Sequence, residues 1–247
     1  MKRIILIVGL IGVVVGIQAA KQYRDFTSAD GKTISGCIVG YDAAKEIVTF
    51  ERDNRKTSKV PIGIFCETDQ AYIRDWDILN SFATERLFKI SIERKMHENE
   101  EKSEKLYNKK ITAKDTHYAI LLENNSACNF KELELEYCIF YEQEEQGSGK
   151  EVNKQGVYCG KIPIDSLKPK SKKTLKTDAV TICKVELDSD WYYGSGSDNV
   201  QEGEVHGIKI RVHMTASSGR KETREDFFPK GMKSKVWATS SERAGMN

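Results

Sequence analysis

The four histidines are the side chains best suited to exchange protons near neutral pH, and they lie in separate stretches of the 247-residue chain at positions 97, 117, 206 and 213. None stands in an HExxH zinc motif, and the sequence has neither a glycine-rich phosphate loop nor a GxSxG nucleophile elbow. Enzymes of this size usually carry such a local motif. The sequence therefore predicts a protein that is not an enzyme, with no catalytic residue, no metal and no cofactor.

A run of aromatic residues offers the clearest binding chemistry. The weak candidates for ligand contact are Trp191, Tyr192 and Tyr193. Flat aromatic rings can cover the apolar face of a sugar at small polar cost. The alternative interpretation is that the run is the end of a strand in the protein core.

Two charged stretches are weaker candidates. The loop at 188–199 holds three aspartates, whose oxygens suit calcium, but their spacing is not that of an EF-hand, which favours a plain polar loop. Residues 168–176 contain five lysines. There are two interpretations of this run, contact with an anionic polymer and an ordinary solvated loop, and the solvated loop is favoured.

The six cysteines show no CxxC spacing, which argues against a zinc knuckle or a redox pair. Cys37 and Cys66 lie in the first part of the chain and the other four lie after residue 120. A bridge between Cys138 and Cys159 is conceivable because they fall on strands expected to be neighbours. Burial as small apolar side chains is the favoured interpretation for the rest.

Residues 1–20 have the pattern of a secretory signal peptide. Lys2 and Arg3 precede an apolar run of 14 residues, and Ala19 and Ala20 offer a cleavage point. A spanning helix needs about 20 apolar residues, so we expect cleavage rather than an anchor. No cysteine lies near the cleavage point, which argues against a lipoprotein. We expect a periplasmic or secreted protein with no membrane span after cleavage.

Charge excludes a general attraction to polyanions. The chain has 39 basic and 37 acidic residues, and loss of Lys2 and Arg3 leaves 37 of each. A chain near neutrality has no global field that attracts nucleic acid or an anionic membrane. Nucleic acid is therefore not an expected partner.

The stretch from Arg24 to Trp76 reads as a compact β-module closed by one helix. Turn residues at 28–32, 42–45 and 53–56 separate four alternating runs, which predict strands over 24–27, 33–41, 46–52 and 57–62. Apolar residues at 72, 73, 76 and 79 then follow helical spacing. A short barrel of about five strands with a docked helix is expected.

This module resembles the SLA-type first homology domain, which is named from a yeast endocytic adaptor and is also found in exported bacterial proteins. The resemblance rests on residues that follow in the family's order: Arg24, Phe26-Thr27, Asp30-Gly31-Lys32, Ile34, Val48, Val60-Pro61, Phe65 and Asp69 to Ile73. It implies an SH3-like barrel and, by analogy with the yeast protein, binding of short peptides. Three positions depart from the family: Phe26 replaces a tryptophan, Cys66 a capping serine, and Asn54-Arg55 a glycine.

The rest of the chain reads as a second, larger β-domain. Alternating runs predict strands near 87–96, 117–123, 132–142, 157–164, 180–187 and 207–215. The segments 97–110 and 144–155 are expected to be polar loops, and the tail after Phe227 ends in Val236-Trp237 and a disordered end. About seven short strands favour an immunoglobulin-like β-sandwich.

The expected molecule is mainly β. A signal peptide (1–20), an SH3-like module with one C-terminal helix (21–80) and an immunoglobulin-like sandwich (86–240) follow one another. The expected function is non-enzymatic interaction with a protein or peptide of the cell envelope. A carbohydrate-binding sandwich and a structural envelope component remain open as alternatives.

Overall fold

The computed structural model describes residues 23–147, 150–188, 191 and 199–237. The chain divides into two compact units, with the division after Gln70. The described part is mainly β-structure and contains one α-helix, α1 (Glu67–Ala83). The expected signal segment lies outside the described residues. Within the described residues, no helix is both long enough and apolar enough to span a bilayer.

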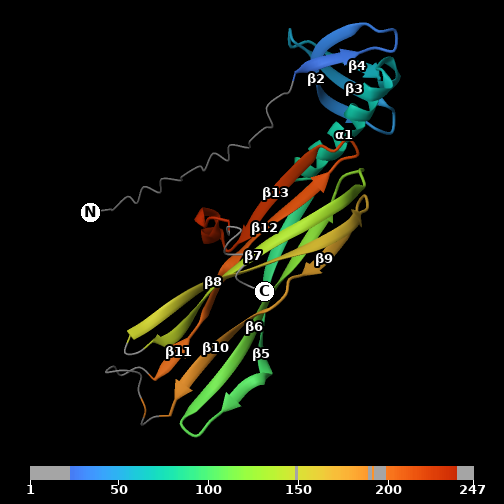
Figure 1. The fold of residues 1–247 in the computed structure, drawn as a ribbon. Helices are drawn as coiled ribbons and strands as arrows, with labels where there is room; N and C mark the ends of the chain where they lie inside the picture. The colour runs from blue at the N-terminus through green and yellow to red at the C-terminus, as the bar shows by residue number, and fades with distance from the viewer. Residues whose placement is uncertain (1–22, 148–149, 189–190, 192–198, 238–247) are drawn as a thin grey trace, which may run out of the picture. The chain divides into compact units, whose positions relative to one another are not determined.

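The first unit is built on four antiparallel strands in the order β1-β2-β3-β4 (Figure 1). Their bounds are β1 (Arg24–Thr27), β2 (Thr33–Asp42), β3 (Ile47–Arg52) and β4 (Thr57–Pro61), followed by the short helix η1 (Ile62–Ile64). These bounds confirm the strands and turns predicted from the sequence. The sheet is not closed into a barrel, and it has four strands where about five were expected. Besides these strands, there is an isolated bridge between Ser28 and Phe65.

Three phenylalanines form the centre of the first unit. The ring of Phe26 lies 5.2 Å from that of Phe50 and 5.6 Å from that of Phe65. A Cβ atom on Gly36 would lie 2.4 Å from the Phe50 ring, so this position in β2 has no room for a side chain. Phe26 is fully buried, and it therefore belongs to the core of this unit.

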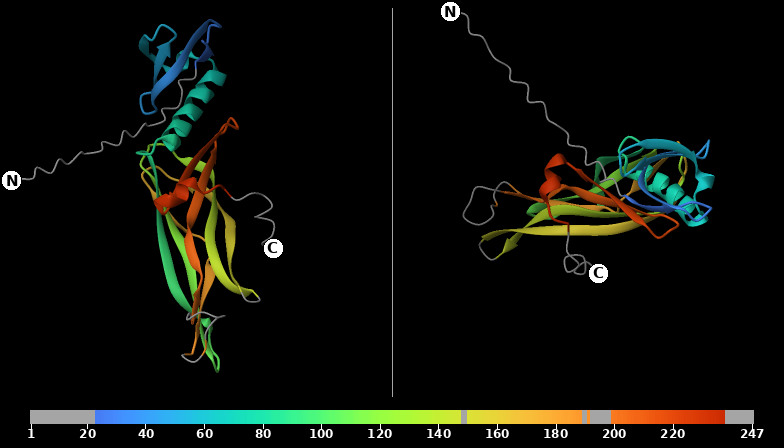
Figure 2. Two further views of the ribbon diagram at one scale, coloured as in Figure 1. Left: turned by 90° about the vertical axis from the view of Figure 1, so that its left-hand side faces the viewer. Right: turned by 90° about the horizontal axis from the view of Figure 1, so that it is seen from above.

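The second unit contains two antiparallel sheets. One has the order β11-β10-β6-β5, with β9 also paired to β6, and the other has the order β13-β12-β7-β8 (Figures 1 and 2). The strands of the first are β5 (Phe88–Lys105), β6 (Lys109–Asn124), β9 (Lys172–Lys176), β10 (Val180–Leu187) and β11 (Val200–Glu202). Those of the second are β7 (Phe130–Gly147), β8 (Lys150–Leu167), β12 (Glu204–Thr215) and β13 (Lys221–Phe228), after which comes the short helix η2 (Lys230–Ser234).

The two sheets share one hydrophobic core. Alternate side chains of both sheets contribute to it, including Tyr118, Ile120 and Leu122 from β6 and Leu133, Leu135 and Ile139 from β7. The helix contributes as well, through Ile78, Leu79 and Phe82. The ring of Phe82 stacks on Phe88 at 4.6 Å, and both lie edge-on to Phe130 at 5.7 Å.

Several polar segments expected to be loops are strands. Residues 97–105 and 109–110 continue β5 and β6, 144–147 and 150–155 continue β7 and β8, and the lysine-rich segment contains β9. Strand β13 was not expected at all. Each of these segments pairs with a neighbouring strand. Backbone pairing between long hairpin strands therefore overrides a charge content that is typical of loops.

Candidate binding site at one end of the two-sheet unit

Two connections meet at one end of the sheet β11-β10-β6-β5. In the turn between β5 and β6, the Leu106 amide donates to the Lys109 carbonyl at 2.8 Å. The Asp188 amide, just after β10, donates to the Asn108 carbonyl at 3.0 Å. We call Leu106, Tyr107, Trp191 and Val200 the aromatic tip, since these exposed apolar residues lie in or beside the two connections.

The side chains of the aromatic tip point to solvent. Tyr107 is 98% exposed and Trp191 is 53% exposed, with Leu106 and Val200 at 37% and 38%. The Trp191 amide donates to the Asp188 carbonyl at 2.9 Å, which ties this residue to the end of β10. For Trp191 this exposure excludes the core-strand interpretation. Tyr192 and Tyr193 lie outside the described residues, as do Asp190 and Asp198 of the calcium candidate.

Leu106 and Tyr107 were not among the binding residues predicted from the sequence. They are the one apolar pair in the charged run from His97 to Lys110, and the hairpin places them at its turn. Large apolar side chains at a turn surrounded by charge are a detectable signal. This signal can be recognised only once the hairpin of β5 and β6 has been predicted.

One pair of opposite charges lies on β10 near the aromatic tip. Lys184 bonds to Glu186 on β10 at 2.7 Å. This hydrogen bond raises the pKa of Lys184 and lowers the pKa of Glu186. Glu186 in turn lies opposite Lys110 on β6.

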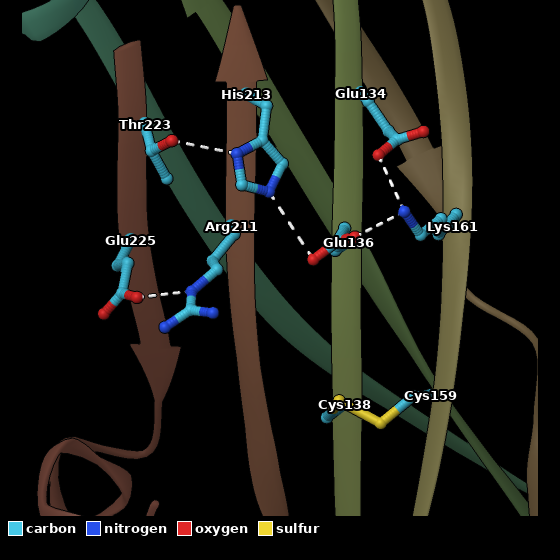
Figure 3. Close-up of polar contacts among 9 residues, drawn as sticks. All are labelled: Glu134, Glu136, Cys138, Cys159, Lys161, Arg211, His213, Thr223 and Glu225. Atoms are coloured by element: carbon cyan, nitrogen blue, oxygen red, sulfur yellow. Dashed lines mark hydrogen bonds and ion pairs between the residues drawn. A yellow bond between two sulfur atoms is a disulfide. The ribbon is translucent and has the colours of Figure 1, made fainter. Parts of the chain in front are cut away.

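The outer face of the sheet β13-β12-β7-β8 holds a row of paired charges (Figure 3). Arg211 bonds to Glu225, and His213 lies between Thr223 at 2.9 Å and Glu136 at 3.5 Å. Lys161 contacts both Glu134 at 3.0 Å and Glu136 at 2.5 Å. Burial raises the pKa of Glu136, but bonds from Lys161 and His213 outweigh it, so the net shift is downward. Each charged side chain of this row therefore has a hydrogen-bond or ion-pair partner, as expected of a surface with a structural role.

Below this row, Cys138 and Cys159 form a disulfide between directly paired positions of β7 and β8 (Figure 3). The sequence had left this bridge open. The C-terminal segment covers it, since Met232 and Trp237 pack with the two cysteines. Arg211 lies 4.2 Å above the Trp237 ring. A small pocket remains beside the disulfide, lined by Glu136, Lys161 and Trp237 among others.

The four other cysteines are free thiols. Cys128 Sγ lies 3.4 Å from Asp77 Oδ2 and 3.7 Å from Ser81 Oγ. Burial, together with the charge of Asp77, raises the pKa of Cys128 to about 11. A thiol that stays protonated at neutral pH is a poor nucleophile, so the geometry at Cys128 does not favour cysteine catalysis.

The histidines are less scattered than the sequence suggested. His97 on β5 and His117 on β6 have ring centroids 6.0 Å apart, whereas His206 and His213 each lie beside a glutamate. The pairing of β5 with β6 brings the first two together. Within the described part of the chain, no group of three metal-ligating side chains forms.

The first unit exposes apolar side chains of its own. Val39 at a bulge in β2 is 37% exposed, Ile64 in η1 is 43% exposed, and Tyr23 is 41% exposed. Tyr23 donates to Glu51 at 2.8 Å, and this bond raises the pKa of Tyr23 to about 12. The edge strands β1 and β4 each pair with one neighbouring strand among the named strands of this sheet.

No protein-family model matches the chain, and no curated protein sequence matches it. The resemblance of the first module to the SLA-type domain therefore stays a prediction.

Solved structures give matches at low similarity. Spo0M, the sporulation control protein of Bacillus subtilis, is 10% identical over 56% of this chain and 47% of its own, so the match spans about half of that protein, with a TM-score of 0.19. The structural genomics target SoR45 is 11% identical over 61% of this chain and 95% of its own, with a TM-score of 0.21. The ApaA protein of Bordetella pertussis is 9% identical over 58% of this chain and 96% of its own, with a TM-score of 0.20. With TM-scores this low, these matches are not evidence for the fold or the function of this chain.

Proposed function

We propose that this chain is an exported, non-enzymatic binding protein of the cell envelope, and that its second unit binds carbohydrate through the aromatic tip. The observation that carries the proposal is the exposure of Trp191 and Tyr107 on two hydrogen-bonded connections. Two rings held by adjacent backbone segments can stack on sugar rings, whose faces are apolar while their edges carry hydroxyl groups. Asn108 and Asp188 supply polar groups beside them.

The proposal takes the second unit to be an immunoglobulin-like β-sandwich and the first to be an SLA-type, SH3-like module. Two facing antiparallel sheets with one core support the former. Four meandering strands followed by one helix, in the order of the family motifs, support the latter. Export is supported by the character of residues 1–20. A disulfide is also compatible with an oxidising compartment such as the periplasm or the extracellular space.

Alanine substitution tests the carbohydrate site. Trp191→Ala and Tyr107→Ala should abolish binding to whichever neutral glycan the unmodified protein retains on a glycan array, without lowering its melting temperature. Val236→Ala removes an apolar side chain that is 80% exposed and lies outside the tip, so it is a matched control. A protein that retains no glycan but self-associates would instead indicate a structural envelope component.

Binding of a protein or peptide by the first unit is the second candidate, because Val39 and Ile64 are exposed and the edge strands offer backbone groups to an added strand. Residues 21–247 can be cross-linked to an envelope extract, and the linked lysines identified by mass spectrometry. Reproducible links from one captured protein to Lys32, Lys45 or Lys59 support this candidate. Capture confined to the second unit counts against it.

A further inference from the structure

Arg94 on β5 carries a guanidinium group that forms no ion pair within the described residues. Even positions of β5, such as Phe88, face the core between the sheets, so Arg94 faces inward as well. Its Nε donates to the Tyr118 hydroxyl at 3.2 Å, and the guanidinium lies 5.9 Å from the centre of that ring. Its neighbours Glu93 and Lys95 face outward and bond to each other.

The acidic residues nearest to Arg94 on the inward side do not neutralise it. Glu98 lies on the same face of β5 but four residues further on, which is about 13 Å along a strand. Burial raises the pKa of Asp226 on β13, and the charges that act on it are those of Arg224 and Glu85, not that of Arg94. Arg94 is therefore a partly buried cation without a counter-charge, and a guanidinium binds a carboxylate through two parallel hydrogen bonds.

Two exposed apolar side chains lie on either side of Arg94. Met96, the next inward residue of β5, is 61% exposed, and Phe228 at the end of β13 is 37% exposed, with its ring 6.4 Å from that of Tyr118. After Phe228 the chain turns to η2, where Met232 packs on the outer face of the other sheet. Strand β13 therefore ends level with Arg94 and does not extend over Met96.

The backbone of β5 is also open at this place. The Tyr118 amide and carbonyl both bond to Thr177, so the backbone of Tyr118 points away from β5. Arg94 pairs with Tyr118, and its own N–H and C=O must then point away from β6. The same holds for Met96 and Glu98, since these groups alternate along a strand. Among its named strands, the sheet has β6 as the one partner of β5.

The other end of this edge is covered. Arg224 on β13 donates to the Phe88 carbonyl at 3.5 Å, and Phe228 lies level with Arg94 through its contact with Tyr118. The uncovered edge thus begins at Arg94 and continues toward Glu98. A chain that adds to β5 in the antiparallel direction has to stop where β13 begins to cover the edge, and its last residue then lies beside Arg94.

We propose that the edge of β5 from Arg94 to Glu98 binds the C-terminal end of an extended peptide whose last residue is apolar. Arg94 takes the terminal carboxylate, Met96 and Phe228 contact the last side chain, and the peptide backbone adds to β5 as an antiparallel strand. The site shares no residue with the aromatic tip and does not depend on carbohydrate binding there.

A fatty acid would supply the same carboxylate and an apolar chain, but it fits less well. An acyl chain needs a deep apolar cavity, whereas the side chains beneath this edge, Tyr118 and Ile120, are fully buried in a packed core. A single apolar side chain on the surface matches the area that Met96 and Phe228 offer. The open backbone groups of β5 have partners in a peptide and none in a fatty acid.

Calorimetry with the whole protein and the acetylated pentapeptide TVTVL tests the proposal. We expect binding that weakens about tenfold or more when the C-terminal carboxylate is replaced by an amide, because a charge-assisted hydrogen-bond pair is lost. Arg94→Gln should weaken binding of the free acid to the same extent, and Arg94→Lys less, since it keeps the charge but not the fork. Arg86→Gln, an exposed arginine before β5, is the matched control and should change nothing.

Hydrogen exchange followed by NMR gives a readout that charge alone would not move. The bound peptide should slow exchange of the Arg94, Met96 and Glu98 amides, while those of Glu93 and Lys95, which face β6, should exchange as before. Absence of binding, equal affinity for acid and amide, or unchanged exchange at these three amides would overturn the proposal. Octanoate bound as tightly as the peptide would overturn it too. Peptide binding that persists in Trp191→Ala separates this site from the aromatic tip.

Discussion

Asp69 is a buried carboxylate, 3% exposed, that joins the start of α1 to β1. It accepts from the Arg24 guanidinium at 2.7 Å and from the Thr27 amide at 2.6 Å. Both bonds lie within the first unit. We expect Asp69→Asn to lower the free energy of unfolding by about 2 kcal/mol, because the amide cannot accept both bonds and the ion pair between Arg24 and Asp69 is lost.

Asp25, the exposed neighbour in β1, is the matched control, and Asp25→Asn should change stability by less than about 0.5 kcal/mol. Urea unfolding followed by circular dichroism measures both variants. Equal effects from the two substitutions would show that the Asp69 contacts contribute nothing specific.

Glu136 should make stability depend on pH. Its pKa in the folded protein is lowered from the ordinary 4.5. The stabilisation is therefore complete above that ordinary value and is lost as the pH falls through the lower folded value. Glu136→Gln should destabilise the protein at pH 7 and should destabilise it less at pH 2.5. Unfolding midpoints across this range measure the difference.

Glu134→Gln is the control for this pH effect, because Glu134 shares Lys161 but is 46% exposed against 14% for Glu136. We expect a smaller loss at pH 7 from Glu134→Gln. If the difference between the unmodified protein and Glu136→Gln stays constant from pH 7 to pH 2.5, the ion pair with Lys161 is not the cause.

At the scale of elements, the C-terminal segment lies against the outer face of β12. A Cβ atom at Gly207 would come within 2.3 Å of the Phe228 carbonyl oxygen and 2.6 Å of Met232. Lys209 Nζ also holds the segment through the Lys235 carbonyl at 2.7 Å. Gly207→Ala should therefore cost about 1–3 kcal/mol, because backbone atoms must shift.

Gly231, in η2, is a matched control, since a Cβ atom there meets nothing within 4 Å. Gly231→Ala should be nearly neutral in the same urea experiment. A Gly207→Ala protein as stable as Gly231→Ala would mean that the segment can move away from β12 without cost.

Each strand of the first unit could be predicted because its turns contain residues that favour turns by their own local conformation and hydrogen bonding. Gly31 adopts a φ of 83° in the turn where it was expected to. Even there, one detail was not predicted: Arg55, in the turn between β3 and β4, adopts a φ of 62°. A positive φ of this kind is uncommon for a residue other than glycine.

In the second unit, only the parts of the strands that have one buried apolar face could be predicted. Strand segments with a buried face, such as Leu133 to Tyr141, alternate clearly, whereas the ends of β5 to β8 are polar on both sides and resemble loops. The aromatic tip depends on how those ends pair, so Tyr107 could not be recognised from spacing. The same holds for the approach of His97 to His117 across β5 and β6, since strand register is not encoded in any one segment.

At the scale of the whole molecule, α1 determines where the second unit begins. Residues 71–83 belong to that unit. Within it, Asp75 accepts from the Ser217 hydroxyl and the Ser218 amide, both at 2.8 Å. Arg224 donates to the carbonyls of Phe82 and Ala83 at 3.2 and 3.0 Å, which satisfies groups left open at the helix end.

These contacts predict how fragments behave. A fragment of residues 67–247 should unfold cooperatively, whereas one of 86–247 should be unfolded or molten, because it lacks Leu79, Phe82 and Asp75, which accepts the hydrogen bonds of Ser217 and Ser218. In the whole chain, Phe82→Ala should cost about 3–5 kcal/mol, while Asn80→Ala, at an exposed position of the same helix, should cost less than about 1 kcal/mol. Calorimetry and near-ultraviolet circular dichroism distinguish these states. A cooperative transition in 86–247 at the temperature of 67–247 would show that the two sheets fold without the helix, and that its packing against them serves only to link the units.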